Sequence, residues 1–317
     1  MALKPPCLRP GDTIGIAAPA SAPPDPKAID RSVHVIERLG FKAKLAPNVR
    51  KRWGFLAGPD RDRAADLMRL FADSKVQAIV CVRGGYGSAR LLPLLDYRLI
   101  RAHPKILVGY SDITSLHTAL LVKTGLVSFH GPMLNSDFIK DDMPTFTLKS
   151  FLRTLSEPGP PGSICQGYRK KTVKVLRTGK ATGELVGGNI SILCASIGTP
   201  WQPSFKRKIL FFEDLDEVPY RFDRMLTQLL NAGLLQQVAG IAVGTNKNCK
   251  DAKARNAKEY RQTVEDVFKE RLLPLRVPVV SGLPFGHVPW NATLPVGVRV
   301  LLDGDRGDLV ITEAAVK

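Results

Sequence analysis

The sequence Ile-Leu-Val-Gly-Tyr-Ser-Asp-Ile-Thr occupies residues 106–114 and decides how this part of the chain folds. Three apolar residues run into a glycine, and a helical pattern begins after Asp112, which is typical of a buried strand that turns sharply into a helix. Gly109 has no Cβ where the chain must fold back closely, and Ser111 would stand at the tip of the turn. The main-chain N–H groups that open the helix favour negative charge at this place.

This turn predicts a nucleophile elbow, in which an exposed hydroxyl stands beside main-chain donors that can hold an oxyanion. The usual elbow pattern is G-x-S-x-G, but position 113 is Ile. The stretch alone therefore leaves two interpretations open. Ser111 is either a nucleophile or an ordinary N-cap at a strand–turn–helix junction.

The bulk composition is typical of a globular protein that buries its own core. With 317 residues, of which 44% are apolar, one large or two ordinary domains are expected. No apolar run is long enough to cross a bilayer, so no membrane contact is expected. The N-terminus does not resemble a secretory signal, and we therefore expect a cytoplasmic protein.

The five cysteines are odd in number and form no C-x-x-C pair. This pattern argues against a disulfide framework and against a zinc cluster, so no metal or cofactor is expected. A lone thiol nucleophile stays open. Cys81 and Cys194, however, lie in apolar runs, where a cysteine is usually a small core residue.

The net charge of +17 makes nucleic acid the first partner to consider. The basic residues are spread along the chain, with one local concentration at 169–180, and no pattern of a known RNA- or DNA-binding motif accompanies it. Net charge bears on steering and solubility rather than on fold. We therefore expect no nucleic-acid partner and attribute the charge to attraction of a small anionic substrate.

Strands and helices alternate through the first half of the chain. Apolar runs and helical spacings predict strands at 12–21, 41–46, 78–82 and 106–108, and helices at 29–39, 61–74, 91–95 and 115–123. This alternation indicates a mostly parallel, doubly wound α/β sheet.

The pattern breaks at 141–183, which is rich in Pro, Gly and basic residues and is interpreted as a boundary and linker without an element of its own. Beyond it, Gly187-Gly188-Asn189 turns into a helix that ends near 196. The remaining pattern predicts strands at 208–212, 238–243 and 277–281, helices at 220–232 and 260–272, and a β-ribbon at 298–312.

A glycine-rich loop, Arg83-Gly-Gly-Tyr-Gly, follows the predicted strand at 78–82. It lacks the patterns of dinucleotide and P-loop sites. Ligands of an open α/β sheet collect at the carboxyl ends of its strands, so this loop and Ser111 should share one edge. An oxyanion hole needs the N–H after the serine and one from a neighbouring loop, and Asp112 and Gly85 fit these two positions.

A nucleophilic serine needs a base, and two of the five histidines are candidates. His130 ends a predicted strand, and His287 lies in a Gly/Pro-dense loop that would hold a side chain rigidly at an exposed edge. Glu213 ends the strand Ile-Leu-Phe-Phe and is well placed to orient an imidazole. Its acidic neighbours Asp214, Asp216 and Glu217 could instead cap the next helix.

Taken together, these segments make the chain similar to the LD-carboxypeptidase family of serine peptidases, which includes the microcin C self-immunity proteins. The matching segments run through nearly the whole chain in the family's order: Leu8-Arg-Pro-Gly-Asp-Thr-Ile, Arg83-Gly-Gly-Tyr-Gly, Gly109-Tyr-Ser-Asp-Ile-Thr, Phe129-His-Gly-Pro-Met, Gly187-Gly-Asn, Phe212-Glu-Asp, Tyr220-Arg-Phe-Asp-Arg-Met-Leu and Gly286-His with Asn291 and Leu294-Pro-Val-Gly.

The resemblance implies a Ser111 nucleophile, a His287 base and a Glu213 orienting acid, with Gly85 and Asp112 as the oxyanion hole. It also implies a flavodoxin-like N-terminal domain at 1–150, a linker at 151–182 and a smaller α/β domain at 183–317. The triad would then lie between the domains, and the protein would be a homodimer.

The implied reaction is hydrolysis, without metal or cofactor, of the bond before the terminal D-alanine of a murein tetrapeptide in peptidoglycan recycling. The free terminal carboxylate of such a substrate would need a cation, and Arg83 is a candidate because arginine suits bidentate carboxylates. A structural pairing of Arg83 is the alternative. An alternative within the same family is a self-immunity type of amide hydrolase that acts on peptidyl or aminoacyl nucleotides.

Overall fold

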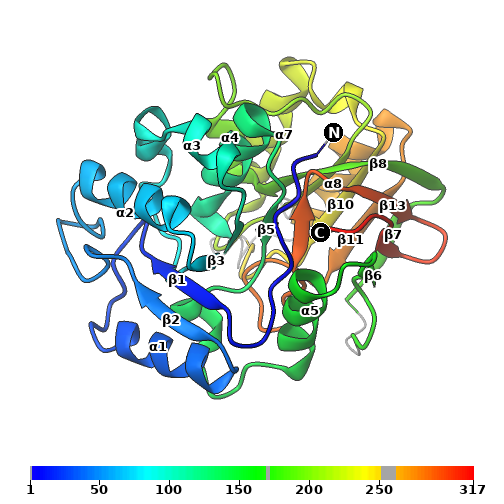
Figure 1. Cartoon of the computed structure of the whole chain (residues 1–317). Helices are drawn as coiled ribbons and strands as arrows, with labels where there is room; N and C mark the ends of the chain where they lie inside the picture. Colours follow the sequence, from blue (N-terminus) through cyan, green and yellow to red (C-terminus); the bar gives the residue numbers. More distant parts are fainter. Residues whose placement is uncertain (1, 169–171, 251–261) are drawn as a thin grey trace.

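A computed structural model describes residues 2–168, 172–250 and 262–317. Within this part of the chain two sheets are built from α/β units, as predicted (Figure 1). The basic residues 169–171 and the first residues of the helix expected at 260–272 lie outside the described residues.

The first sheet has strand order β2-β1-β3-β4-β5-β12. Its first five strands are parallel, and the sixth pairs antiparallel with the last of them. The strands are β1 (Thr13–Ala17), β2 (Lys42–Leu45), β3 (Val76–Cys81), β4 (Ile106–Gly109), β5 (Ser128–His130) and β12 (Leu294–Val296). Strands β3 and β4 are apolar and buried because helices and loops cover both faces of a parallel sheet.

The helices of this half include the predicted ones and others that the sequence pattern did not indicate. They are α1 (Ala28–Arg38), α2 (Asp60–Ala72), the 3-10 helix η1 (Ala89–Leu94), α3 (Tyr97–Ala102) and α4 (Thr114–Thr124), followed by the π-helical turn η3 (Leu134–Phe138) and α5 (Thr145–Ser156). Helix α4 ends at Gly125, whose φ of +72° is the left-handed conformation that glycine adopts without strain.

The second sheet is mixed, with strand order β6-β14-β13-β8-β9-β10-β11-β7. Its strands are β6 (Gly162–Ser163), β7 (Lys174–Arg177), β8 (Lys180–Asn189), β9 (Ile209–Glu213), β10 (Gly240–Gly244), β11 (Val279–Leu283), β13 (Arg299–Asp303) and β14 (Asp308–Ile311). Helices α6 (Ile190–Ala195), α7 (Pro219–Asn231) and α8 (Val264–Leu272) pack around a separate apolar core with residues of β8, β9 and β10.

Two expectations for the middle of the chain are wrong. The segment 141–183 is not free of secondary structure, because it carries α5, β6, β7 and the start of β8. Strand β8 was also missed, since paired glycines in a strand interior weaken the strand pattern. The domain limits 1–150, 151–182 and 183–317 stay a prediction, and β12 of the C-terminal stretch completes the first sheet.

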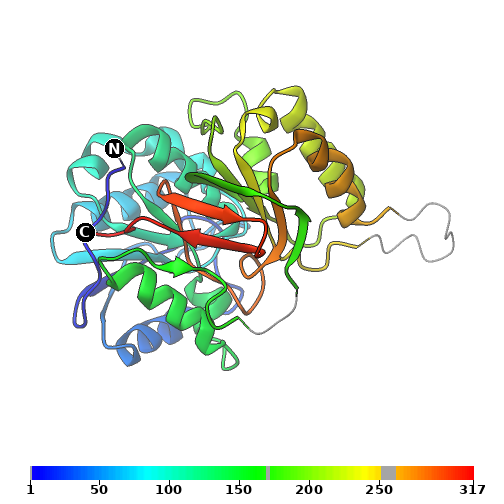
Figure 2. The ribbon, with the colours of Figure 1, turned by 90° about the vertical axis from the view of Figure 1, so that its right-hand side faces the viewer.

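The chain ends lie together. The Cys7 N–H donates to the Lys317 carbonyl at 2.9 Å, and the Lys317 N–H donates to the Pro5 carbonyl at 3.0 Å. In Figure 2 both ends lie on the side of the molecule away from α8. The segment before β1 of the first sheet is therefore hydrogen-bonded to the residue Lys317, which follows β14 of the second sheet.

The carboxyl ends of β4 and β8 also meet. The Asn189 N–H donates to Thr114 Oγ1 at 2.9 Å, and a Cβ on Gly188 would lie 2.4 Å from the same oxygen. This contact brings the end of the second sheet's long strand onto the first turn of α4. The ends of β4 and β9, which carry Ser111 and Glu213, are thereby held on the same side of the molecule.

We expect Gly187→Ala to destabilise the fold strongly. Gly187 pairs with Phe211 of β9, and a Cβ at Gly187 would lie 1.8 Å from the Phe211 carbonyl oxygen. The two strands would have to move apart. The loss in the free energy of unfolding should therefore exceed the usual range of point mutants and reach on the order of 4 kcal/mol. Thermal and denaturant unfolding measure it. Gly159→Ala is the control, since no atom lies within 4 Å of a Cβ there, and equal stability of the two variants would contradict the packing described.

Candidate active site at the carboxyl ends of both sheets

The predicted strand–turn–helix at Ser111 is present. Strand β4 leads into the 3-10 turn η2 (Ser111–Ile113) and then into α4. Ser111 has a φ of +62°, a left-handed conformation that a residue other than glycine adopts only where the surrounding structure enforces it. A Cβ on Gly109 would lie 2.9 Å from Ile113 Cγ1, so glycine is needed for the tight return. These are the features of an elbow rather than of an ordinary N-cap.

The glycine-rich loop lies directly against this elbow. A Cβ on Gly84 would lie 3.0 Å from Ser111 Cβ and 3.2 Å from its hydroxyl oxygen. The carboxylate of Asp112 accepts the Ser88 N–H at 2.8 Å, and the Asp112 carbonyl accepts the Ser88 hydroxyl at 2.6 Å. These hydrogen bonds fix the position of the glycine-rich loop relative to the elbow.

Two main-chain donors flank Ser111. Gly85 has a φ of +108°, and its neighbour Tyr86 donates its N–H to Ser21 Oγ at 3.2 Å. In the part of the chain that the structure describes, no hydrogen bond uses the N–H of Gly85 or that of Asp112. The two residues predicted for an oxyanion hole therefore keep the donors that such a site requires.

Glu213 and His287 are in direct contact. Oε2 of Glu213 lies 2.6 Å from Nδ1 of His287. The carboxylate is fully buried at the end of β9, whereas 14% of the His287 side chain is exposed. A Cβ on Gly286 would lie 2.8 Å from the same Glu213 oxygen, so the residue before His287 must be small. Because Nδ1 bonds to a carboxylate, it carries the proton and leaves Nε2 as the free base.

The other acids near Glu213 have different partners. Asp214 accepts hydrogen bonds from the Asn189 side-chain amide at 2.8 Å and from the Ser191 hydroxyl at 2.6 Å. Glu217 pairs with Arg221 one helical turn later, at 3.3 Å. Among the described acids at and just after the end of β9, Glu213 is thus the one that contacts the imidazole of His287.

The elbow approaches His287 through Tyr110. The buried Tyr110 ring lies edge-on to the imidazole, with ring centroids 4.9 Å apart. Within the described residues no hydrogen bond joins the Ser111 hydroxyl to His287. Catalytic hydrogen bonds of this kind commonly tighten only when substrate is bound. The contact of Tyr110 places the residue before Ser111 against the imidazole.

The competing histidine is buried. His130 is fully inaccessible, and its ring packs edge-on to Phe211 with centroids 5.2 Å apart. Neither ring nitrogen has a hydrogen-bond partner in the described part of the chain, and burial holds the pKa of His130 well below its ordinary value. His117 is buried as well and contacts the Gly109 carbonyl and the Ser128 hydroxyl, each at 2.8 Å. The geometry thus favours His287, which the residue pattern alone could not choose over His130.

The environment of His287 makes its imidazole a stronger base than usual. Burial by itself lowers the pKa of His287, but the hydrogen bond to Glu213 and the charge of that carboxylate outweigh it, and the pKa is raised above its ordinary value. The pair stabilises the fold fully below the unfolded-state pKa of about 6.5, and this contribution is lost as the pH rises through the folded-state value. A base of this kind is well suited to accept a proton from a serine.

Arg83 lies next to Gly85. Its guanidinium donates to the Ala22 carbonyl at 3.4 Å and lies 3.6 Å from the position of a Cβ on Gly85. The side chain is half-buried and forms no ion pair with the described residues. A cation is therefore available near one of the two oxyanion donors.

Cys81 and Cys194 show no features of a nucleophile. Burial raises the pKa of Cys194 to about 12, and it raises that of the fully buried Cys81 further. Among the described residues no group of three or more His, Cys, Asp or Glu side chains could hold a metal ion. No helix in the described ranges is both long and apolar enough to span a bilayer.

Comparison with known proteins identifies the family. The sequence profile of the LD-carboxypeptidase N-terminal domain matches residues 14–131, and that of the LD-carboxypeptidase C-terminal domain matches residues 182–302. The chain belongs to the LD-carboxypeptidase family. It is 41% identical over 313 residues to a probable murein peptide carboxypeptidase of Bacillus subtilis, covering 99% of this chain and 95% of that protein.

Two further relatives are a self-immunity protein and a muramoyltetrapeptide carboxypeptidase. The microcin C7 self-immunity protein MccF of Escherichia coli is 30% identical, over 96% of this chain and 94% of its own length. The crystal structure of a muramoyltetrapeptide carboxypeptidase from Oxalobacter formigenes has 33% identity and a TM-score of 0.81, covering 94% of this chain and 97% of that one. The family and the α/β fold are thus established, and the chain is a peptidase by family.

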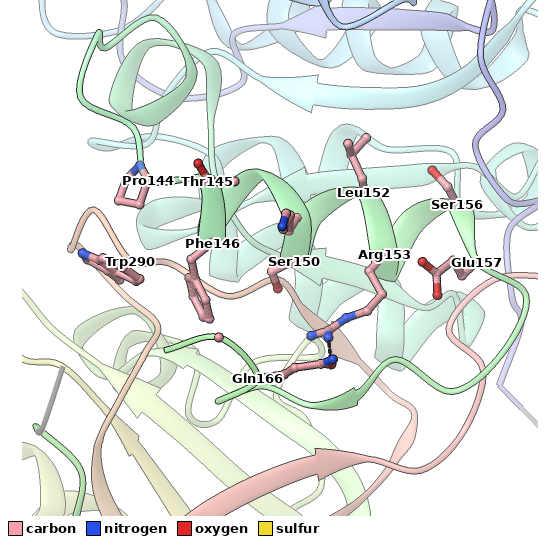
Figure 3. A pocket seen from close by; sticks show the side chains of 12 residues that line it. Pro144, Thr145, Phe146, Ser150, Leu152, Arg153, Ser156, Glu157, Gln166 and Trp290 are labelled. Carbon is pink, nitrogen blue, oxygen red and sulfur yellow. Dashed lines mark hydrogen bonds between the residues drawn. The ribbon is translucent and has the colours of Figure 1, made fainter. Parts of the chain in front are cut away.

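The structure has a large groove along α5 and a smaller pocket that adjoins the candidate triad. A groove of about 860 Å³ runs along α5, with Phe146 and Trp290 towards one end and Arg153, which bonds to Gln166, towards the other (Figure 3). Its lining includes none of the three candidate triad residues. The second pocket, of about 210 Å³, is lined by His287 and is therefore the one next to the chemistry.

We expect the Glu213 contact to control the ionisation of His287. In Glu213→Gln the carboxylate charge is gone while burial remains, so the pKa of His287 should fall below its wild-type value. NMR titration of the histidine ring protons measures the change. His117, whose pKa burial lowers to about 4, is the internal control and should be the same in both proteins. An unshifted His287 would mean that the pair does not persist in solution.

Proposed function

We propose that this protein is a serine-type LD-carboxypeptidase that removes the terminal D-alanine of murein tetrapeptides during peptidoglycan recycling in the cytoplasm. The single observation that carries the proposal is the 2.6 Å contact between buried Glu213 and His287, which stands beside the Ser111 elbow. The resemblance to the LD-carboxypeptidase family extends the proposal to a homodimer that binds a muropeptide and neither nucleic acid nor membrane.

In the proposed first step, Nε2 of His287 takes the hydroxyl proton of Ser111 as the serine oxygen attacks the carbonyl before D-alanine. Glu213 holds the imidazole in the tautomer with Nδ1 protonated and stabilises the cation that forms. The N–H groups of Gly85 and Asp112 hold the oxyanion of the tetrahedral intermediate.

In the following steps, the imidazolium of His287 gives its proton to the leaving nitrogen, and D-alanine departs. Water then attacks the acyl-enzyme while His287 accepts a proton from that water, and the serine oxygen leaves with a proton returned to it. The residues of this chain thus supply nucleophile, base and oxyanion donors without a metal or cofactor. Arg83 is proposed to bind a carboxylate of the substrate close to Gly85.

A second candidate is supported by structural similarity to the self-immunity branch. The structure of MccF in complex with aspartyl sulfamoyl adenosine has 29% identity and a TM-score of 0.88, over 99% of this chain. A self-immunity type of activity would hydrolyse an amide of a peptidyl or aminoacyl nucleotide with the same proposed triad.

We expect Ser111→Ala to abolish the release of D-alanine from a disaccharide tetrapeptide. The loss of kcat should be on the order of 10⁴-fold or more, because the members of a triad act as a unit. Chromatography of the muropeptides and an assay of free D-alanine measure it. Ser115→Ala, one turn further along α4, is the matched control and should keep the wild-type rate. Undiminished activity of Ser111→Ala would remove Ser111 from the mechanism.

The two candidate functions are separated by presenting both kinds of substrate to the wild type. We expect hydrolysis of the tetrapeptide at least ten times faster, by kcat/KM, than hydrolysis of an aminoacyl nucleotide amide. Mass spectrometry follows both products in one mixture, with Ser111→Ala as the blank. Release of the nucleotide without release of D-alanine would favour the self-immunity activity over the carboxypeptidase.

A further inference from the structure

The 210 Å³ pocket beside His287 has a charged rim. Tyr110 and His287 form one wall, and Lys140, Asp142 and Lys247 contribute side chains from two other loops. The lysines are exposed, whereas Tyr110 is buried. The pocket is therefore bordered both by the imidazole and by two solvent-exposed cations.

The chemistry of the proposed reaction decides which part of a substrate lies here. His287 must give its proton to the leaving nitrogen, so the leaving amino acid has to contact the imidazole. From that nitrogen the carboxyl carbon of the same amino acid is only two bonds away, about 2.5 Å by standard backbone dimensions. A cation that binds this carboxylate must consequently border the same hollow as His287.

Lys247 is held in a fixed relation to the triad. It follows β10, and its carbonyl accepts the Asp216 N–H at 2.9 Å, in a bridge between the segments after β9 and β10. Glu213 ends β9, so the backbone of Lys247 is tied to the strand that carries the orienting carboxylate. Lys140 follows the turn η3, and its N–H donates to the Asp137 carbonyl at 3.1 Å.

Neither lysine is neutralised by an ion pair. In the described ranges, Lys140 and Lys247 have no carboxylate within salt-bridge distance. Asp137 lies beneath the pocket, 7% exposed, where its carboxylate accepts the Met133 N–H at 2.9 Å. Asp142 is the one exposed acid at the rim and offsets part of the charge. The two lysines still leave room for an additional anion.

We propose that this pocket receives the leaving amino acid and that Lys140 and Lys247 bind its terminal carboxylate. The assignment rests on the proposed carboxypeptidase function and explains why such an enzyme would remove only a terminal residue. A chain that continued past this residue would bring an uncharged amide between the lysines. Arg83, on the Gly85 side of Ser111, is then left for a carboxylate on the acyl part of the substrate.

The test compares a tetrapeptide that ends in free D-alanine with the same peptide ending in D-alaninamide. Wild type should prefer the free acid by at least about tenfold in kcat/KM. The double variant Lys140→Met/Lys247→Met should lose most of this preference. Its kcat/KM for the free acid should fall, whereas its kcat/KM for the amide should stay at the wild-type value. Lys149→Met, which changes a lysine of the groove along α5, is the matched control and should keep the preference.

Three results would overturn the assignment. Wild type could fail to discriminate between acid and amide, or the double variant could keep the full preference. An equal loss of kcat/KM on both substrates would mean that the lysines act on folding or on the triad instead. Unfolding temperatures report on folding, and the hydrolysis of a small uncharged ester reports on the triad. If wild type cleaved neither peptide, the proposed function itself would fail, and this assignment with it.

Discussion

The fully buried carboxylate of Glu213 is the constraint on which the rest of this structure depends. Glu213 lies at 0% exposure, and its Oε1 has no hydrogen-bond partner among the described residues. Burying such a charge is costly unless a partner of opposite charge or a strong donor is supplied. His287 is that partner, and the loop that carries it must therefore return to the end of β9. The small residue at 286 and the compact turn around it follow from this requirement.

The same constraint explains why two sheets are needed. Ser111 follows a strand of the first sheet, whereas Glu213 ends a strand of the second. Each of the two residues is therefore placed by the carboxyl end of a parallel strand in its own sheet. The contacts between Thr114 and Asn189 and between Tyr110 and His287 hold these ends together. The positive φ of Ser111 is consistent with a nucleophile held by its surroundings rather than by local preference.

Much of this arrangement could be predicted from local pattern. Apolar runs such as 106–108 and 209–212 are continuous because their strands are buried on both faces, and the elbow followed from the residues between a strand and a helix. Strand β8 could not be predicted, because Gly187 and Gly188 weaken a strand pattern, although close packing on Phe211 requires the first glycine and close packing on Thr114 requires the second. The choice of His287 over His130 depends on burial, which a single sequence does not reveal. The lysines beside His287 carry no local signal, since exposed lysines occur throughout a chain with this net charge.

Strand β12 has a consequence for how the protein is made. Its three residues extend the first sheet by pairing with β5, yet β6 to β11 lie between them and β5 in the chain. During synthesis the ribosome releases β1 to β5 well before it releases β12, so β5 presents an unpaired edge while those strands are still being made. Exposed edges of this kind invite pairing with other nascent chains. The first sheet thus remains incomplete until most of the second sheet has been synthesised.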